Sequence, residues 1–251
     1  MGYPWGAMGK TRLDQLVVER GLAESREQAR RYILAGWIRV DSQPATKPGN
    51  TYPSDAHLER IGVQRFVSRG GEKLEGAFEA FGFSVEGLDC LDVGVSTGGF
   101  TDCLLQHGAR HVVAVDVGHG QIHPRLLADP RVTSREGFNA RYMTADDLPY
   151  RPAFAVTDVS FISLTLILPP MAAVLAEGGG IVALIKPQFE VGRGNAPGGL
   201  VREESLRLAA RDDIVRFATE TLGLELLGLA ESPIRGRERG NVEYLSYWRK
   251  P

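Results

Sequence analysis

The 251-residue sequence contains only two cysteines, Cys90 and Cys103, and it has no long run of apolar residues. Two cysteines are too few for a disulfide scaffold and cannot by themselves bind a structural metal, so we expect no metal site. No segment approaches the roughly 18 uninterrupted apolar residues of a transmembrane helix. Residues 1–10 also lack the apolar stretch of a signal peptide. We therefore expect a cytoplasmic protein without stable membrane association.

Neither sign of charge dominates the whole chain, because 29 Lys and Arg stand against 31 Asp and Glu. The net charge of −2 gives no indication of a nucleic-acid partner. The charges are unevenly distributed, however: residues 1–66 hold 10 basic and 7 acidic side chains, whereas the remainder has a net charge of −5. This asymmetry predicts a small basic domain followed by a larger acidic one.

The basic segment has the pattern of two short helices followed by a small β element. Ser25 and Gln28 have the spacing of a capping box, which predicts a helix beginning there with Ala29, Tyr32 and Ile33 facing inward. The segments RLD and SREQARRYILAGWIRVDSQ, which carry this pattern, resemble the S4-type RNA-binding domain.

The resemblance implies that this basic face binds structured RNA. We expect contacts to RNA phosphates from four arginines: Arg12, Arg26, Arg30 and Arg31. A solvated helix face is the alternative interpretation. We divide the chain into an N-terminal extension (residues 1–10), an S4-like domain (11–62), a linker (63–68) and a second domain (69–251).

In the second domain, short apolar runs alternate with helical segments, which predicts an α/β fold around a mostly parallel sheet. The segment DVGVSTGGF at 92–100 is a glycine-rich turn after the first strand of this sheet. Its spacing matches neither G-x-G-x-x-G nor a P-loop. It resembles instead the loop that holds the amino-acid part of S-adenosylmethionine (SAM), with Asp92 near the ammonium group.

Asp116 ends the next strand, 18 residues after Gly98, where a carboxylate can accept hydrogen bonds from both ribose hydroxyls of an adenosine. Capping of a turn is the alternative role for Asp116. Asn139 is a candidate contact to the adenine edge. The full set of candidate cofactor-binding residues is Asp92, Gly94, Ser96, Thr97, Gly98, Gly99, Phe100, Asp116, Val117 and Asn139.

Charged residues also end two later strands. Asp158 follows the fourth strand, and Lys186 follows the fifth, where Pro187 holds it in an extended conformation. Carboxyl ends of parallel strands form the usual catalytic edge, so we expect these charges to meet there. A purely structural ion pair is the alternative. Lys73 in SRGGEKL and Glu243 in GNVEYL are further candidates.

Together, SRGGEKL, LDVGVSTGGFTDCLL, DVGHGQ, VTDVSFISL, IKPQFEVG and GNVEY resemble the hemolysin-A-like (TlyA-type) ribosomal RNA 2′-O-ribose methyltransferases, whose catalytic domain is of the FtsJ kind. The resemblance runs from about Arg12 to Trp248 and implies a Rossmann-like class I sheet with an antiparallel last strand. It also implies SAM as cofactor and ribosomal RNA or ribosomal subunits as partner. In that family the matching residues form a catalytic tetrad, here Lys73, Asp158, Lys186 and Glu243.

The implied target is a cytidine 2′-hydroxyl, with Lys186 as its proton acceptor or hydrogen-bonding activator. The resemblance implies a target in the large subunit, the small subunit or both. Because the chain stops soon after its last strand, without the extra C-terminal helical segment that dual-subunit members tend to carry, we expect large-subunit RNA to be the main substrate. Arg235, Arg237 and Arg239 form a basic loop that we expect to contact RNA beside Glu243. Two other functions remain open at this point: a membrane-active hemolysin, and an RNA-binding assembly factor without catalysis.

Overall fold

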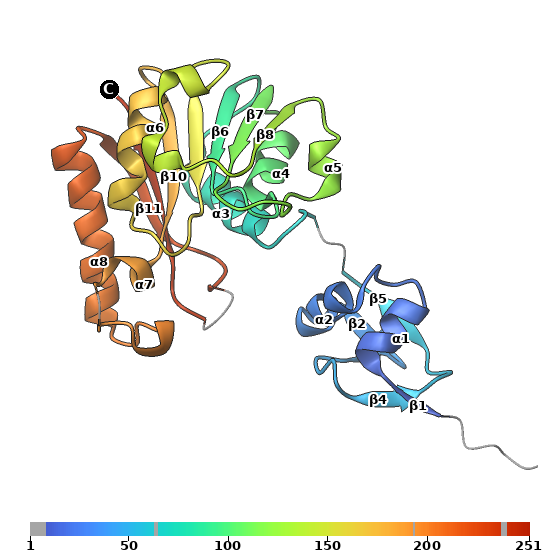
Figure 1. Cartoon of the computed structure of the whole chain (residues 1–251). Helices are drawn as coiled ribbons and strands as arrows, with labels where there is room; N and C mark the ends of the chain where they lie inside the picture. Colours follow the sequence, from blue (N-terminus) through green and yellow to red (C-terminus); the bar gives the residue numbers. More distant parts are fainter. Residues whose placement is uncertain (1–8, 63–64, 193, 237–239) are drawn as a thin grey trace, which may run out of the picture. The chain divides into compact units, whose positions relative to one another are not determined.

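The computed structural model describes residues 9–62, 65–192, 194–236 and 240–251. The chain divides between Arg65 and Phe66 into two compact units (Figure 1). The first unit contains β1 (Lys10–Arg12), α1 (Leu13–Glu19), α2 (Arg26–Leu34), β2 (Ile38–Val40), β3 (Gln43–Pro44), β4 (Thr51–Pro53) and β5 (Leu58–Arg60).

Helix α2 begins as its sequence predicts. Ser25 is the N-cap and accepts a hydrogen bond from the backbone N–H of Gln28 at 3.2 Å. The Gln28 side chain reaches one residue further back than in a standard capping box, to the backbone N–H of Glu24 at 2.6 Å. Ala29, Tyr32 and Ile33 are buried, as expected. They pack against the small sheet in which β2 pairs with β3 and β5.

The second unit is built around a seven-stranded sheet in the order β11-β12-β10-β9-β6-β7-β8. Its strands are β6 (Asp89–Val93), β7 (His111–Val115), β8 (Val132–Arg135), β9 (Phe154–Thr157), β10 (Gly180–Ile185), β11 (Glu225–Glu231) and β12 (Tyr244–Arg249). Strands β6 to β10 pair in parallel, whereas β12 is antiparallel to both β10 and β11. The predicted sheet, mostly parallel with an antiparallel last strand, is confirmed.

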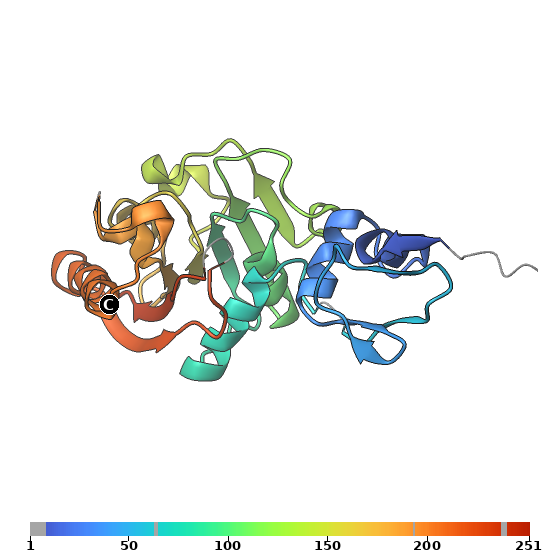
Figure 2. The ribbon, with the colours of Figure 1, turned by 90° about the horizontal axis from the view of Figure 1, so that it is seen from below.

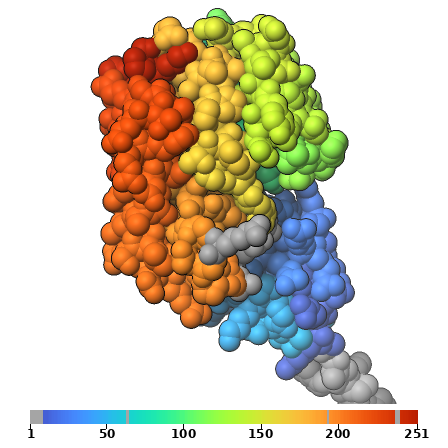
Figure 3. Space-filling model, turned by 60° about the vertical axis from the view of Figure 1, so that its left-hand side comes forward, coloured from blue at the N-terminus to red at the C-terminus, as the bar shows by residue number. Residues whose placement is uncertain are grey.

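Helices cover both faces of this sheet. The helices are α3 (Gly70–Phe81), α4 (Gly99–Gln106), α5 (Pro124–Leu127), α6 (Leu168–Val174), α7 (Pro187–Glu190) and α8 (Glu204–Arg216); shorter turns include η1 (Ala140–Tyr142) and η3 (Leu164–Leu166). One core joins α3, α4 and α5 to the sheet, and a second joins α6 and α8 to its other face. Figure 2 separates these layers, with the teal α3 on one side of the strands and the yellow α6 segment on the other. Figure 3 shows the outer surface of the second layer, where the orange α8 segment lies against the α6 segment.

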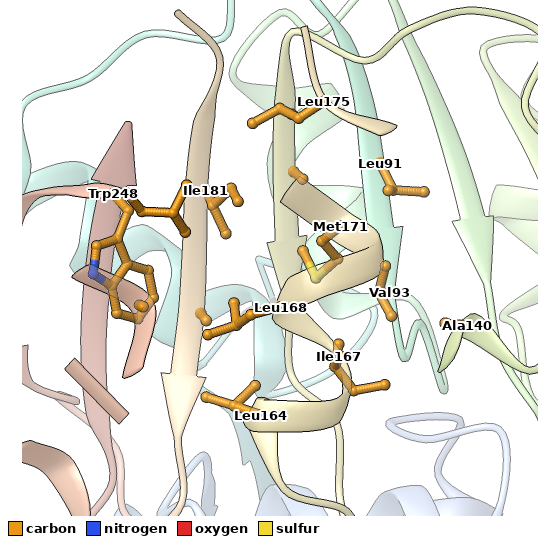
Figure 4. Packing of buried hydrophobic residues seen from close by; sticks show 14 of the residues in the cluster. Leu91, Val93, Ala140, Leu164, Ile167, Leu168, Met171, Leu175, Ile181 and Trp248 are labelled. Atoms are coloured by element: carbon orange, nitrogen blue, oxygen red, sulfur yellow. The ribbon is translucent and has the colours of Figure 1, made fainter. Parts of the chain in front are cut away.

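Packing around α6 fixes the loops that follow β9 and β10. Leu168 and Met171 of α6 are fully buried between Ile181 of β10 and Leu91 of β6 (Figure 4). Helix α6 begins at Leu168, and Pro169 and Pro170 stand in its first turn. Proline is well accommodated in a first helical turn, because the N–H it lacks has no partner there.

The proposed linker contributes to the second unit. Phe66 and Val67 are buried in the core formed with α3 and α4, so the compact unit begins before residue 69. Residues 63 and 64 of that linker lie outside the described part of the chain. Of the helices that the structure describes, none is both long and apolar enough to cross a membrane.

Candidate active site

Four separate elements bring the predicted catalytic tetrad to one edge of the sheet. Asp158 directly follows β9, and Lys186 directly follows the neighbouring parallel strand β10. Glu243 immediately precedes β12, whose first residue lies opposite the last residue of β10. An antiparallel strand therefore starts where its parallel neighbours end, which places Glu243 at the same edge. Lys73 is the fourth residue of α3, at the end of its first turn.

The four side chains form a continuous chain of ion pairs. Lys73 Nζ donates to Glu243 Oε2 at 2.7 Å and lies 3.6 Å from Asp158 Oδ2. Lys186 Nζ lies 2.6 Å from the other carboxylate oxygen, Asp158 Oδ1. Lys73, Lys186 and Glu243 are all less than a tenth exposed. Buried charges are tolerated only when they are paired, so each member of this chain depends on its neighbours.

Ser160 also belongs to this site, although sequence reasoning gave it no role. Lys186 Nζ donates to Ser160 Oγ at 2.8 Å and to the backbone oxygen of Asp158 at 3.3 Å. Three oxygens of a single loop therefore orient the ammonium group. The feature of the sequence that could have indicated Ser160 is its position, two residues after a candidate catalytic aspartate.

The glycine-rich loop surrounds a buried carboxylate. Asp92 is fully buried; its Oδ2 accepts from Thr101 Oγ1 at 2.6 Å, and its Oδ1 has no hydrogen-bond partner among the described residues. Burial raises the pKa of Asp92 to about 7, against the opposing hydrogen bond from Thr101. A buried acceptor without a partner suits a cationic ligand group, so this loop fits the ammonium end of SAM.

The loop requires glycine at two of its positions. Gly94 and Gly98 have φ values of +85° and +98°, in the region that side chains disfavour. A Cβ at Gly98 would also lie 2.2 Å from Leu126 Cδ1. Gly98 and Gly99 open helix α4, while Phe100 faces the core at 3% exposure.

Asp116 contacts this loop, and Asp116 and Asn139 both make turn contacts. The two carboxylate oxygens of Asp116 accept from the backbone N–H groups of Ser96 and Gly118, each at 2.8 Å. Asn139 Oδ1 accepts from the N–H of Arg141 at 3.2 Å and caps η1. A carboxylate oxygen has a second lone-pair site, so turn capping and ribose binding are compatible. Their contacts to SAM remain predictions, as do those of the exposed Val117 and of Ser96 and Thr97.

The four arginines of the first unit that are predicted to contact RNA fall into two pairs. Arg12 and Arg26 both contact the buried carboxylate of Asp14, at 3.0 and 3.1 Å. The hydrogen bond from Arg12 lowers the pKa of Asp14 to about 2. Arg30 and Arg31, in contrast, are exposed on α2. The predicted RNA contacts therefore comprise two structurally engaged arginines and two on the surface.

The basic loop before β12 approaches the tetrad. Arg235 is exposed, and its backbone oxygen accepts from Arg69 at 3.1 Å. A Cβ at the next residue, Gly236, would lie 2.7 Å from Glu243 Oε1, so the loop passes directly over this carboxylate. Arg237 and Arg239 lie outside the described residues.

One group of possible metal donors occurs away from this edge, between α3 and α4. Donor atoms of Glu75, Cys103 and His107 lie within 4.8 Å of one another. His107 Nε2 is 2.7 Å from Glu75 Oε2, which is hydrogen-bond spacing, and its ring stacks on Phe78 with centroids 3.7 Å apart. These contacts describe hydrogen-bonded packing between two helices.

Three features of the second unit define a class I methyltransferase domain. They are a seven-stranded sheet with one antiparallel strand, a glycine-rich turn after β6, and charged residues at the carboxyl ends of the parallel strands. The FtsJ-like methyltransferase family matches residues 66–250, and the S4 domain family matches residues 11–54. The chain therefore belongs to the FtsJ-like methyltransferase family and carries an S4 domain ahead of the catalytic one.

Similarity to individual proteins extends over nearly the whole chain. The 16S/23S rRNA (cytidine-2′-O)-methyltransferase TlyA of Mycobacterium tuberculosis is 45% identical over 243 residues, which cover 96% of this chain and 90% of that protein. Hemolysin A of Brachyspira hyodysenteriae is 43% identical over 242 residues, covering 94% and 99% respectively. A solved structure of a hemolysin-named protein from Streptococcus thermophilus aligns with a TM-score of 0.76 and 45% identity, covering 97% of this chain and 90% of that one.

Proposed function

We propose that this protein transfers a methyl group from SAM to the 2′-hydroxyl of a cytidine in ribosomal RNA. The observation that carries the proposal is the buried chain Glu243–Lys73–Asp158–Lys186 at the sheet edge that also carries the glycine-rich loop. The Mycobacterium tuberculosis relative is named for this reaction on both 16S and 23S RNA. We propose large-subunit RNA as the main substrate and the cytoplasm as the compartment.

The chemistry requires activation of a weak nucleophile. A ribose hydroxyl must lose its proton as its oxygen attacks, so a group within hydrogen-bond reach has to accept or polarise that proton. When bound, SAM supplies an electrophilic methyl group on a sulfonium centre. Lys186 Nζ contacts the hydroxyl, while Asp158 and Ser160 hold this amine in place. Lys73 and Glu243 fix Asp158 from the other side.

The remaining parts bind cofactor and RNA. Asp92 receives the SAM ammonium group on its free oxygen, and Asp116 with Asn139 binds the adenosine. Ribose is common to every nucleotide, so the catalytic edge alone provides little discrimination between sites. The S4 domain supplies the additional RNA affinity through its arginines, and the loop at Arg235 contributes basic charge close to Glu243.

Methylation of purified ribosomal subunits tests this function. Small and large subunits from cells lacking the protein are incubated with the purified protein and labelled SAM. The modified nucleotide is then mapped. We expect label on a cytidine ribose of large-subunit RNA. Failure to label either subunit, despite SAM binding, contradicts the proposal.

The variant Lys186→Ala separates the alternatives. Loss of methyl transfer with RNA binding retained is expected for the enzyme. An assembly factor would keep its function in this variant. Lysis of erythrocytes by a folded but methylation-deficient Lys186→Ala protein would instead support the hemolysin activity that the Brachyspira relative is named for.

A further inference from the structure

The loops after β9 and β10 are tied together at two separate points. At the first point, Lys186 contacts Asp158 and Ser160. The second point lies one helical turn further on, at Glu190, the last residue of α7. The segment 158–164 is therefore attached to the segment 186–190 at both of its ends.

The carboxylate of Glu190 makes the second attachment with both of its oxygens. Oε2 accepts from Ser163 Oγ at 2.5 Å, and Oε1 accepts from the backbone N–H of Leu164 at 2.9 Å. Ser163 also caps the turn η3 by accepting from the N–H of Thr165. Burial raises the pKa of Glu190, and the two donated hydrogen bonds oppose this shift. Glu190 thus fixes the point at which the loop becomes helical.

The backbone between the two attachments is strained. Phe161 has a φ of +65°, which costs a non-glycine residue about 1–2 kcal/mol. Its side chain is 82% exposed, and its ring lies 5.2 Å from that of Phe189. Such a conformation persists only where its surroundings hold it. Release at Ser163 and Leu164 would let the loop relax and would move Ser160, three residues earlier.

We propose that Glu190 is a positioning residue for methyl transfer. By holding the far end of the 158–164 loop, it keeps Asp158 and Ser160 aligned on Lys186 Nζ. Glu190 does not contact the reacting atoms in this arrangement. The inference rests on the proposed function, since it assigns Glu190 to the same site.

The full-length variants Glu190→Ala and Glu190→Gln test the proposal against Glu79→Ala, which removes an exposed glutamate from α3. Glutamine can keep both contacts, because its oxygen can accept from Leu164 N–H and its amide can donate to Ser163 Oγ. We expect Glu190→Ala to lower kcat about 10- to 100-fold, the range that small misplacements cause, with the KM for SAM nearly unchanged. Glu190→Gln should retain most of the activity, and Glu79→Ala all of it.

Hydrogen exchange of the 158–164 amides provides a readout that does not depend on activity. We expect faster exchange there in Glu190→Ala than in the wild type and in Glu79→Ala. If the wild type does not methylate ribosomal RNA but this exchange still increases, the proposed function fails, and only the anchoring of the 158–164 loop by Glu190 stands. An unchanged kcat in Glu190→Ala overturns the inference, as does an equal loss of kcat and SAM affinity in both Glu190 variants.

If Glu190→Ala does not fold, Ser163→Ala removes one of the two hydrogen bonds to Glu190. It should lower kcat by less than the roughly 10- to 100-fold expected for Glu190→Ala, and the KM for SAM should again be nearly unchanged.

Discussion

Both units of this protein use ion pairs, but they bury them differently. In the Lys73–Glu243 pair of the catalytic unit both partners are buried, since each residue is less than a tenth exposed. In the S4 domain only the acid is buried, since Asp14 is 1% exposed whereas Arg12 and Arg26 are 48% and 58% exposed. An exposed guanidinium can contact a phosphate without leaving its carboxylate, because it has five N–H donors. A buried ammonium cannot change partners without a large desolvation cost.

The contrast predicts that substitutions at the catalytic edge strongly reduce activity or stability, whereas those on the S4 surface weaken RNA binding only slightly.

Lys186→Ala should have the largest effect. We expect its rate of methyl transfer to fall about 100- to 10,000-fold, the usual contribution of a positioned acid–base group. Single-turnover rates at saturating SAM measure this change, and calorimetry should show SAM binding retained. A loss smaller than tenfold would remove Lys186 from the reaction.

Glu243→Gln should mainly reduce stability. Lys73 could still donate to the glutamine carbonyl, but it would lose its nearest negative charge and keep only Asp158, at 3.6 Å, as a charged partner. Breaking a buried pair in this way costs about 3–5 kcal/mol. Urea denaturation of the full chain measures the free energy of unfolding.

The double variant Lys73→Met with Glu243→Leu provides the matched control. Replacing both buried charges by apolar groups should restore much of the stability, because no charge is left unpaired. It should not restore methyl transfer. If activity returns together with stability, this pair serves folding alone.

SAM affinity should depend on the protonation of Asp92. The pKa of Asp92 in the free protein is raised to about 7, and a bound ammonium group favours the ionised carboxylate. Below pH 7 the carboxyl must lose a proton on binding, so the Kd should rise by up to about tenfold per pH unit as the pH falls. Above pH 7 the Kd should level off until the amino group of SAM itself begins to lose its proton, at about pH 8.

Calorimetric titration with SAM between pH 5.5 and pH 8 measures this dependence, and Asp92→Asn should abolish it. The stability of the SAM-free protein should show the opposite trend. Its folded state binds more protons than the unfolded state between the two pKa values of Asp92, so its free energy of unfolding should fall as the pH rises from about 4 to 7. A flat Kd in the wild type would place the ammonium group elsewhere.

The sequence predicted the strand ends better than the loops. Asp158 and Lys186 could be placed together because parallel strands end at one edge of a sheet. Lys73 could not be placed there, since it comes from a helix, and only the family resemblance assigned it to the tetrad. Ser160 and Glu190 were missed because their roles depend on how the 158–164 loop folds, including the positive φ of Phe161.

Predicting the roles of polar residues from sequence was also difficult, because one polar side chain can either bind a ligand or stabilise a turn. Asp116 stands at a strand end, where sequence reasoning offered ribose binding and turn capping as alternatives, and its observed contacts are those of a turn. Arg12 was predicted to contact RNA from its charge and from the resemblance of its segment to an S4 domain. Its pairing with Asp14, two residues away, depends on the helix start that turns both side chains to the same side.

The smallest expected effects are on the S4 surface, where Arg30→Gln and Arg31→Gln should each weaken rRNA binding only a few-fold. Each substitution should also lower the slope of log Kd against log salt concentration by about one, as expected for one lost phosphate contact. Filter binding at several KCl concentrations measures both quantities.

Arg12→Gln provides the comparison, because it additionally leaves buried Asp14 with Arg26 as its remaining cation. That variant should weaken RNA binding and destabilise the S4 domain, with the loss of stability present above about pH 4 and vanishing as Asp14 is protonated toward its pKa of about 2. If Arg30→Gln and Arg31→Gln change neither affinity nor salt slope, the exposed face of α2 does not contact RNA.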